Sequence, residues 1–191
     1  MTVPERIFVV DIETTGLTGE PESHIVEVGI VELFKQKHVI PIYHSIVAPY
    51  YPISKDWDQS WVFQNTSLTP EQVLTGRSVT KVIMDLHLFL DKQPATSYNY
   101  AFDFGRFLDR DPWRICNEPM PCIMEACGAA YGDVLPCNKF SGCPSAQSSY
   151  SYLCPDNPAE LPGGIEEHRA LSDAIMEAHI LKAMLARGDY P

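Results

Sequence analysis

The sequence has few basic residues for its number of acidic ones. Lys and Arg number 14 against 25 Asp and Glu, so the formal net charge is −11. Sequence-blind binding along nucleic acid needs many Lys and Arg contacts to phosphate, and this charge argues against a long basic track. It leaves room for a short footprint on an anionic partner, and for an acidic site that metal ions neutralise.

Hydrophobic segments of the kind that target or anchor a protein are also missing. No apolar stretch approaches the ~20 residues that a membrane span requires. The apolar run at residues 7–10 is too short for the core of a secretory signal peptide. We therefore expect a cytoplasmic protein that does not enter a membrane.

The six cysteines include no Cys-x-x-Cys pair, and all of them fall between Cys116 and Cys154. Structural zinc sites usually contain such a close pair, so the spacing argues against zinc. An intracellular chain normally keeps its thiols reduced, which argues against a disulfide framework. We expect buried or inert thiols in this segment.

What the sequence does contain is the pattern of a mixed α/β domain. Its 191 residues, with 45% hydrophobic and 20% charged residues, fit a single globular domain. Residues 6–11 predict a central strand, and residues 24–33 and 39–47 two further strands joined by a turn at 35–37. Pro41 predicts an edge or a bulge in the third strand.

The second half of the chain is mainly helical in pattern. Thr69 and Pro70 form a helix start, and apolar residues at three- and four-residue steps predict later helices. The predicted helices cover residues 79–90, 103–109, 123–131 and 171–185, with a short strand at 95–98. Residues 132–164 are rich in Pro, Gly, Ser and Cys and predict mostly loop.

The first chemical motif is Asp-Ile-Glu-Thr-Thr-Gly at residues 11–16, at the end of the first strand. Residues two apart on a strand point to the same side, so Asp11 and Glu13 can reach one ion. Hard cations such as Mg²⁺ or Mn²⁺ prefer oxygen ligands of this kind. Taken alone, such a pair is more often a solvated strand end.

Two further motifs lie near the starts of predicted helices. Asp103 follows the short fourth strand, where an acid at a helix start also has an ordinary role opposite the helix dipole. His168 precedes Asp173 by five residues, and in a continuous helix the two would lie about 140° apart. We therefore place His168 in a turn before the last helix. A lone histidine there is more often structural than catalytic.

Together the three motifs resemble the DEDDh exonuclease family of the ribonuclease H-like superfamily, whose members include the proofreading subunit of bacterial DNA polymerase III, RNase T and oligoribonuclease. Three modest motifs in the same order make a specific match. The resemblance spans about residues 6–187 and implies a single exonuclease domain over residues 1–191. It implies a ribonuclease H-like fold with a mixed five-stranded sheet flanked by helices.

The resemblance also implies the chemistry. The chain would hydrolyse the 3′-terminal phosphodiester of a nucleic acid and release nucleoside 5′-monophosphates, using two Mg²⁺ or Mn²⁺ ions. Two divalent cations would neutralise the four carboxylates, which otherwise raise one another's pKa values. Asp11 would bridge both ions, Glu13 and Asp173 would serve the ion that holds the attacking water, and Asp103 the other. His168 would act as general base on that water.

The family's nucleotide-contacting segment corresponds here to the end of the first motif and its neighbours. The residues expected to bind substrate are Thr14, Thr15, Gly16, Leu17, Asn99 and Phe102. Gly16 would allow close backbone approach and Leu17 would wedge against a base, whereas Phe102 is equally suited to packing. Trp57, Trp61, Tyr150 and Tyr152 could stack on bases, although such residues more often fill a core.

Several alternatives stay open. The form of the first motif favours DNA, and an exoribonuclease of the RNase T or oligoribonuclease type is the alternative within the same chemistry. A non-catalytic nucleic-acid-associated adaptor with the same fold is the alternative of another class, although a scaffold gains nothing from clustered carboxylates. Single-stranded or frayed 3′ ends are the expected partner, and a homodimer or a polymerase or repair partner is left open.

Overall fold

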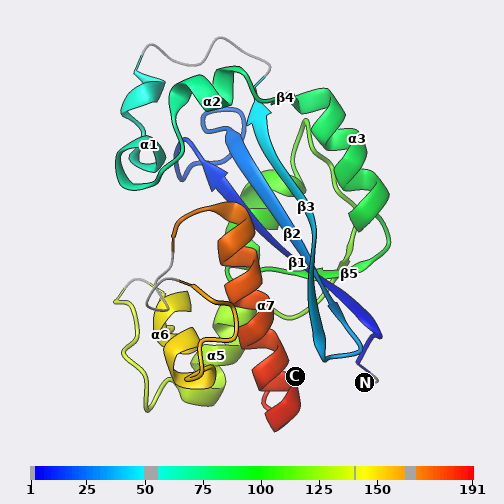
Figure 1. Ribbon diagram of the computed structural model, residues 1–191, viewed down its shortest axis with the longest axis vertical. Coiled ribbons are helices and arrows are strands. Elements are labelled where there is room, and N and C mark those ends of the chain that lie inside the picture. The colour runs from blue at the N-terminus through cyan, green and yellow to red at the C-terminus, as the bar shows by residue number, and fades with distance from the viewer. Residues whose placement is uncertain (1–2, 50–55, 140, 162–166) are drawn as a thin grey trace.

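The computed structural model describes residues 3–49, 56–139, 141–161 and 167–191. Its centre is a twisted, mixed sheet with the strand order β4-β3-β2-β1-β5-β6 (Figure 1). The strands are β1 (Arg6–Thr14), β2 (Ile25–Phe34), β3 (His38–Ala48), β4 (Arg77–Ser78), β5 (Pro94–Thr96) and β6 (Glu118–Pro119). β1, β2 and β3 pair antiparallel, and β5 runs parallel to β1.

The prediction of five strands was wrong by one, although the mixed α/β architecture is confirmed. The prediction had too few strands because β4 and β6 are only two residues long and lie at the edges of the sheet, parallel to β3 and β5. A two-residue strand has no period that a sequence pattern could reveal. The predicted irregularity at Pro41 is confirmed as a register shift between β2 and β3.

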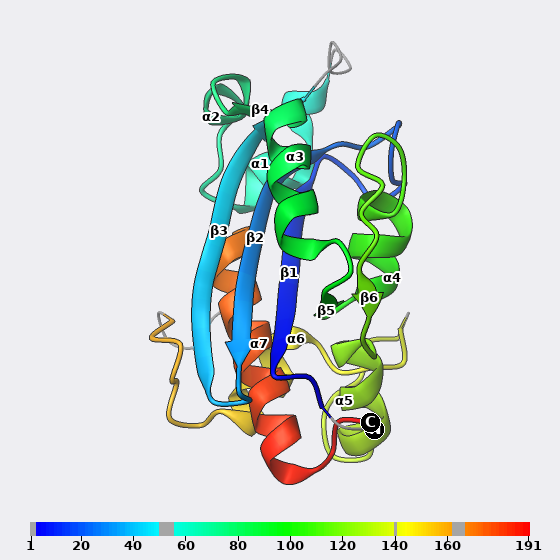
Figure 2. The same ribbon diagram turned by 90° about the vertical axis from the view of Figure 1, so that its right-hand side faces the viewer.

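Helices occupy both faces and the ends of the sheet (Figures 1 and 2). They are η1 (Trp57–Gln59), α1 (Trp61–Asn65), α2 (Pro70–Leu74), α3 (Val79–Leu90), α4 (Tyr100–Phe102), the π-helix η2 (Asp103–Leu108), α5 (Ile123–Tyr131), α6 (Ala146–Leu153) and α7 (Ala170–Arg187). The predicted cap at Thr69 is a full capping box with Gln72, which satisfies two otherwise unpaired backbone N–H groups. Among the helices of the described residues, none is both long and apolar enough to cross a membrane.

The predicted loop over residues 132–164 contains a helix that the prediction missed. α6 begins after Ser145, whose hydroxyl accepts a hydrogen bond from the backbone N–H of Ser148. Its buried residues Ala146, Ser149, Tyr150 and Leu153 lie on one face, and two of the four are polar or small. The apolar periodicity was too weak to stand out from the Pro- and Cys-rich surroundings.

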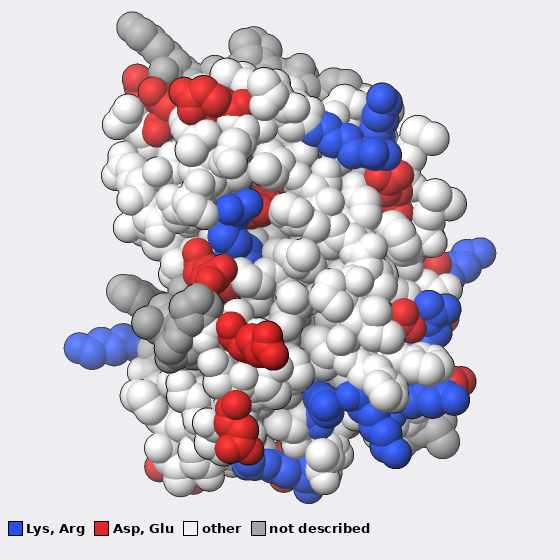
Figure 3. Space-filling view, in the orientation of Figure 1, with Lys and Arg blue, Asp and Glu red and all other residues white. Residues whose placement is uncertain are grey.

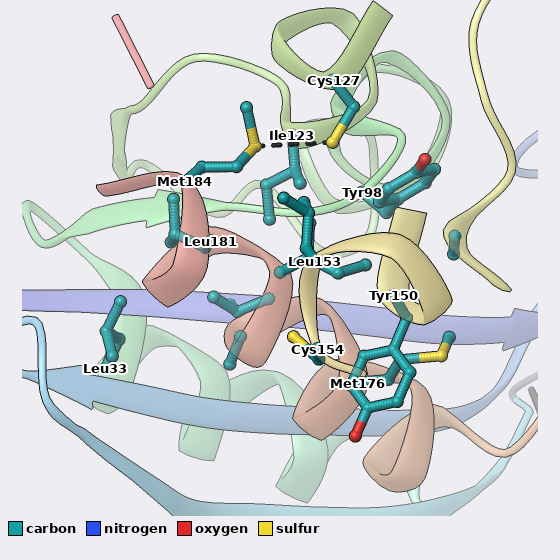
Figure 4. Close-up of a cluster of buried hydrophobic side chains, with 14 of the residues drawn as sticks. Leu33, Tyr98, Ile123, Cys127, Tyr150, Leu153, Cys154, Met176, Leu181 and Met184 are labelled. Carbon is teal, nitrogen blue, oxygen red and sulfur yellow. Dashed lines mark hydrogen bonds between the residues drawn. The ribbon is translucent and has the colours of Figure 1, made fainter. Parts of the chain in front are cut away.

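Two cores lie on opposite faces of the sheet because the side chains of β1 alternate between them. Ile7 and Val9 join the core beneath α5, α6 and α7. Figure 4 shows Leu33, Tyr150 and Leu181 of the same core. Phe8 and Val10 join the core beneath α3 and η2. All six cysteines carry free thiols, and Cys127 of the first core donates to the sulfur of Met184 at 3.4 Å.

Candidate active site

The carboxylates of β1 lie on the face that α7 covers. Ile7 and Val9 pack beneath α7, and the period of two carries the same face on to Asp11 and Glu13. On this face of β1 the side chains are therefore apolar within the core and acidic beyond its edge. The charges of Glu13 and of Asp173 in α7 both raise the pKa of Asp11, as expected if the two carboxylates of β1 share a side.

A glycine in β2 lets α7 begin directly beside these carboxylates. Gly29 pairs with Asp11 across the sheet, and a Cβ atom on Gly29 would lie 2.4 Å from the carbonyl oxygen of Ala170. Real Cβ atoms do not approach an oxygen so closely, so a larger residue would push the first turn of α7 off the sheet. Gly29 thus brings the third motif up to the first.

His168 lies in a turn ahead of α7, as predicted, and the helix begins at Ala170. Its backbone is left-handed, with φ +51°, a conformation that a non-glycine residue keeps only where its surroundings impose it. The turn brings His168, Glu13 and Asp173 together, with ligand atoms of all three within 4.8 Å of one another. We call these three residues the outer group. The glycines at 163 and 164 lie outside the described residues.

Arg169, the residue after His168, fixes this turn through an ion pair. Arg169 holds the buried carboxylate of Glu27, with Nε 2.9 Å from Oε2 and Nη2 2.6 Å from Oε1. Glu27 also bonds the ring of His44 at 2.6 Å and accepts from the backbone N–H of Ala170 at 3.3 Å. Burial raises the pKa of Glu27, but the hydrogen bonds from His44 and Arg169 outweigh it and bring the pKa to about 2. Arg169 also donates to the hydroxyl of Ser67 at 2.9 Å, which ties α7 to the connection between α1 and α2.

The second motif presents its acid from a π-helical turn. The carbonyl of Asn99 accepts from the backbone N–H groups of Phe102 at 2.8 Å and Asp103 at 3.1 Å, so Asn99 acts through its backbone at the start of the turn. The N–H of Asp109 bonds the carbonyl of Phe104, five residues back, which is the π-helical pattern. Asp103 is buried, and burial raises its pKa to about 7 although hydrogen bonds to its carboxylate act in the opposite direction.

Among the described residues, five carboxylates gather at this end of β1, one more than the sequence predicts. Burial raises the pKa of Asp11 well above the usual range of an aspartate. Four other carboxylates raise it further, in the order Glu177, Asp103, Glu13 and Asp173. The four predicted acids are therefore brought together. Glu177 was missed, and the available signal was its position four residues after Asp173, on the same helical face. We call Asp11, Asp103 and Glu177 the inner group.

The hydroxyls expected to meet a nucleotide are already used within the chain. Thr14 donates to the carbonyl of Gly16 at 2.7 Å, and Thr15 accepts from the backbone N–H of His24 at 2.9 Å. A Cβ atom on Gly16 would lie 2.6 Å from the hydroxyl oxygen of Ser23, so glycine is required for packing here. These three residues shape the turn after β1, where the backbone N–H of Thr15 also donates to the carbonyl of His24 at 3.0 Å.

Two exposed apolar side chains, Leu17 and Trp61, contact residues of the second and third motifs or their neighbours. Leu17 is 71% exposed, and its carbonyl accepts from Arg106 at 2.6 Å. The guanidinium of Arg106 also lies 5.9 Å from the ring of Phe102, which packs edge-on against Phe107. Trp61 is 55% exposed and sets its ring edge-on to that of His168, with centroids 5.0 Å apart.

The remaining predicted aromatic candidates differ in their placement. Tyr150 is buried in the core beneath α7. Tyr152 is partly exposed beside Tyr131, and Trp57 packs edge-on against Phe63. Lys and Arg side chains on the face shown in Figure 3 form separate patches with no continuous track between them. This agrees with the short footprint that the net charge predicts.

The arrangement places acids at the end of a central strand and a histidine beside the last helix. The RNase T exonuclease family model matches residues 8–181, and the chain belongs to this exonuclease family. A comparison with curated proteins gives no match.

Solved exonuclease structures share the ribonuclease H-like fold. Exonuclease I of E. coli in complex with a dA16 oligonucleotide aligns with a TM-score of 0.62 and 16% identity, covering 96% of this chain and 41% of that one. Cell-death related nuclease 4 gives 0.60 and 14%, covering 96% and 64%. A full-length 3′-exonuclease gives 0.59 and 20%, covering 97% and 62%. The chain thus spans about two fifths of the length of Exonuclease I.

Proposed function

We propose that this chain is a metal-dependent 3′→5′ exonuclease that removes nucleoside 5′-monophosphates from the 3′ end of a nucleic acid. The observation that carries the proposal is the outer group: ligand atoms of Glu13, His168 and Asp173 lie within 4.8 Å of one another. Asp11 and Asp103 lie beside it, close enough for their charges to interact. The family membership supports the same class of reaction.

The donor set fits divalent cations. Within the residues that the structure describes, Oδ2 of Asp11 is buried and has no hydrogen-bond partner, which is costly unless a cation binds it. Carboxylate oxygens are the ligands that Mg²⁺ and Mn²⁺ prefer. We propose two such ions, held by Asp11, Glu13, Asp103 and Asp173. When bound, they would supply a nucleophilic water and stabilise charge on the leaving oxygen.

The protein's own part in the reaction falls mainly to His168. Its ring lies beside Glu13 and Asp173 and edge-on to the ring of Trp61. The unprotonated nitrogen of a neutral imidazole can accept a proton from water. We propose that His168 takes the proton of the attacking water and that Arg169 keeps the histidine in place.

We propose that the substrate is a single-stranded or frayed 3′ end, with DNA favoured over RNA. Two Exonuclease I structures that share this fold hold dA16 and 5cy-dT13 oligonucleotides. In this chain the exposed Leu17 and Trp61 flank the acids, where unpaired bases would stack or wedge. We further propose that residues 1–191 form one exonuclease domain and that the protein is cytoplasmic.

Matched substrates test the proposal. Single-stranded DNA, duplex DNA and RNA of one sequence, each labelled at the 5′ end, are digested with Mg²⁺ or Mn²⁺, with Asp103→Asn as the inactive control. We expect stepwise shortening of single-stranded DNA that stops in the control variant. If the RNA is shortened faster than the single-stranded DNA, RNA is the preferred substrate and the proposal of DNA is wrong.

The same assay tests the adaptor alternative. An adaptor would bind the oligonucleotides but shorten none of them with either metal, and the metals would leave its melting temperature unchanged. If both results are obtained, the proposed activity is wrong, because the chain then neither responds to the metals nor hydrolyses a nucleic acid.

A further inference from the structure

Arg106 joins the loop after the first motif to the helix that carries the second motif. Its Nη1 donates to the carbonyl of Leu17 at 2.6 Å. The loop also approaches the backbone of Arg106, because a Cβ atom on Gly19, whose φ is +95°, would lie 2.6 Å from the Arg106 carbonyl oxygen. Arg106 lies in η2, three residues after Asp103. The loop is therefore held against the same π-helical turn that presents a proposed metal ligand.

The loop that carries Leu17 is held by further contacts of its own. The backbone N–H of Ser23 donates to the carbonyl of Gly19 at 2.9 Å, and Glu20 accepts from the indole N–H of Trp113 at 3.2 Å. The Leu17 side chain is 71% exposed on this constrained loop. An apolar group presented in this way loses little conformational freedom when it meets a base.

The charge of Arg106 is not used in an ion pair within the described part of the chain. Several other arginines do pair with carboxylates, namely Arg6, Arg77, Arg114 and Arg169. The Arg106 guanidinium instead donates to the neutral carbonyl of Leu17 and lies 5.9 Å from the ring of Phe102. A guanidinium has several N–H donors, so an exposed cation with donors to spare lies beside Leu17.

Arg110 offers a comparison four residues further along the chain. It is exposed as well, but its Nε donates to the carbonyl of Gly105 at 2.8 Å, within its own segment of the chain. The two arginines therefore carry the same charge in the same region, whereas Arg106 is the one that contacts the loop after the first motif.

We propose that Arg106 binds a phosphate of the nucleic-acid strand next to the nucleotide that Leu17 contacts. Arginine forms charge-assisted hydrogen bonds to phosphate oxygens, two at a time where the geometry allows. The proposed metal ions take the phosphate that is cleaved, so Arg106 would take one on its 5′ side. The inference rests on the proposed function, because it requires a strand whose 3′ end lies at the acids. It deepens that function by assigning a substrate contact to a residue outside the three motifs.

Arg106→Gln removes the charge and keeps an amide donor. We measure kcat and KM for single-stranded DNA, labelled at its 5′ end, with Mn²⁺ at several salt concentrations. KM should rise by about tenfold with little change in kcat, because a hydrogen bond to a charged group is lost. The slope of log KM against log salt should fall by about 0.7, as expected for one phosphate contact on a single strand.

Two companion variants separate phosphate binding from a role in fixing the loop. Arg110→Gln removes the neighbouring exposed charge and should leave KM and its salt slope unchanged. Arg106→Lys keeps a charge that binds phosphate and should retain the wild-type slope while recovering part of the KM. If Arg106→Gln raises KM without changing the salt slope, Arg106 only fastens the loop and the proposal is overturned.

Neutral linkages identify the phosphate. DNA with one methylphosphonate, which carries no charge, is prepared with that linkage at successive positions 5′ to the cleaved bond. At one position KM should rise for the wild type and rise no further for Arg106→Gln. Equal losses in both proteins at every position would contradict the contact. If the wild type shortens no nucleic acid, the proposed function fails, whereas an active wild type with an unaltered Arg106→Gln variant overturns this inference alone.

Discussion

The inner and outer groups meet at the end of β1, but they are held in place in different ways. Asp11, Asp103 and Glu177 of the inner group are crowded carboxylates, and burial raises the pKa values of both aspartates. Glu13, His168 and Asp173 of the outer group converge on a turn that an ion pair fixes from behind. The outer group is held by contacts within the protein, whereas the inner group crowds buried acids whose charge a bound cation would offset.

The largest expected effect comes from neutralising one acid of the inner group. Asp103→Asn keeps the shape of the side chain but removes a charged oxygen ligand. Turnover should fall by about 10⁴-fold or more, because positioning and charge stabilisation by the metal are lost together. Stabilisation by Mn²⁺ in a thermal melt should shrink in parallel. Normal metal-dependent stabilisation in this variant would remove Asp103 from the metal site.

His168→Ala should show that the two groups have different roles, because it should lower turnover and leave metal binding intact. Loss of a general base lowers turnover by roughly 10²- to 10⁴-fold, while the carboxylates proposed to bind metal are intact. We therefore expect Mn²⁺ affinity, measured by calorimetry, to stay close to that of the wild type. Near-wild-type turnover would exclude His168 from the reaction.

Loosening the support behind the outer group should have a smaller effect. Arg169→Lys keeps a positive charge but cannot hold Glu27 with two parallel hydrogen bonds. Turnover should fall by about 10- to 100-fold, because a misplaced base loses its alignment, with little change in Mn²⁺ affinity.

A double-mutant comparison checks how Arg169 acts. In the His168→Ala background, Arg169→Lys should have almost no further effect on turnover, because both changes act on the same group. A full additional loss there would show that Arg169 acts on the substrate or the metal instead of on His168.

Trp61→Ala should weaken substrate binding more than it slows turnover. Stacking on one base contributes about 1–3 kcal/mol, so KM for single-stranded DNA should rise by about tenfold. Trp61→Phe keeps a ring and should recover much of the loss. An unchanged KM in Trp61→Ala would limit Trp61 to packing against His168.

The last prediction concerns the pH dependence of stability that Asp103 of the inner group contributes. Burial raises the pKa of Asp103 to about 7, so the folded protein holds a proton there that the unfolded chain releases near pH 4. Stability of the metal-free protein should therefore fall as pH rises from about 4 to 7, by at most about 4 kcal/mol, and level off above it. Thermal melts in EDTA should show a shallower slope for Asp103→Asn, and an equal slope would contradict this assignment.

How much of this site the sequence predicts depends on how local each signal is. Asp11 and Glu13 follow from the period of a strand, and the turn at His168 follows from the angle that a continuous helix would impose. Gly29 and Glu27 were missed because their roles depend on Ala170 and Arg169, about 140 positions later in the chain. A glycine inside a strand rich in β-branched residues was the one available sign of a close approach.

The fold shows the same limit. Long periodic elements such as α3 and α7 agree with their predicted positions, because an apolar stripe of three or more turns is unambiguous. The prediction missed β4, β6 and α6, because their pairing and packing depend on residues that are distant in the sequence. Glu177 was missed for the same reason, because its place near the other acids depends on how α7 packs against β1.

The end from which a nucleic acid is shortened tests the central claim most directly. A single-stranded DNA carrying a label at its 5′ end, and a second copy labelled at its 3′ end, are digested with Mg²⁺ and with EDTA. The account predicts a ladder of products shortened one nucleotide at a time from the first, immediate release of a labelled mononucleotide from the second, and no product in EDTA. Internal cleavage products, release from the 5′ end, or digestion in EDTA would contradict it.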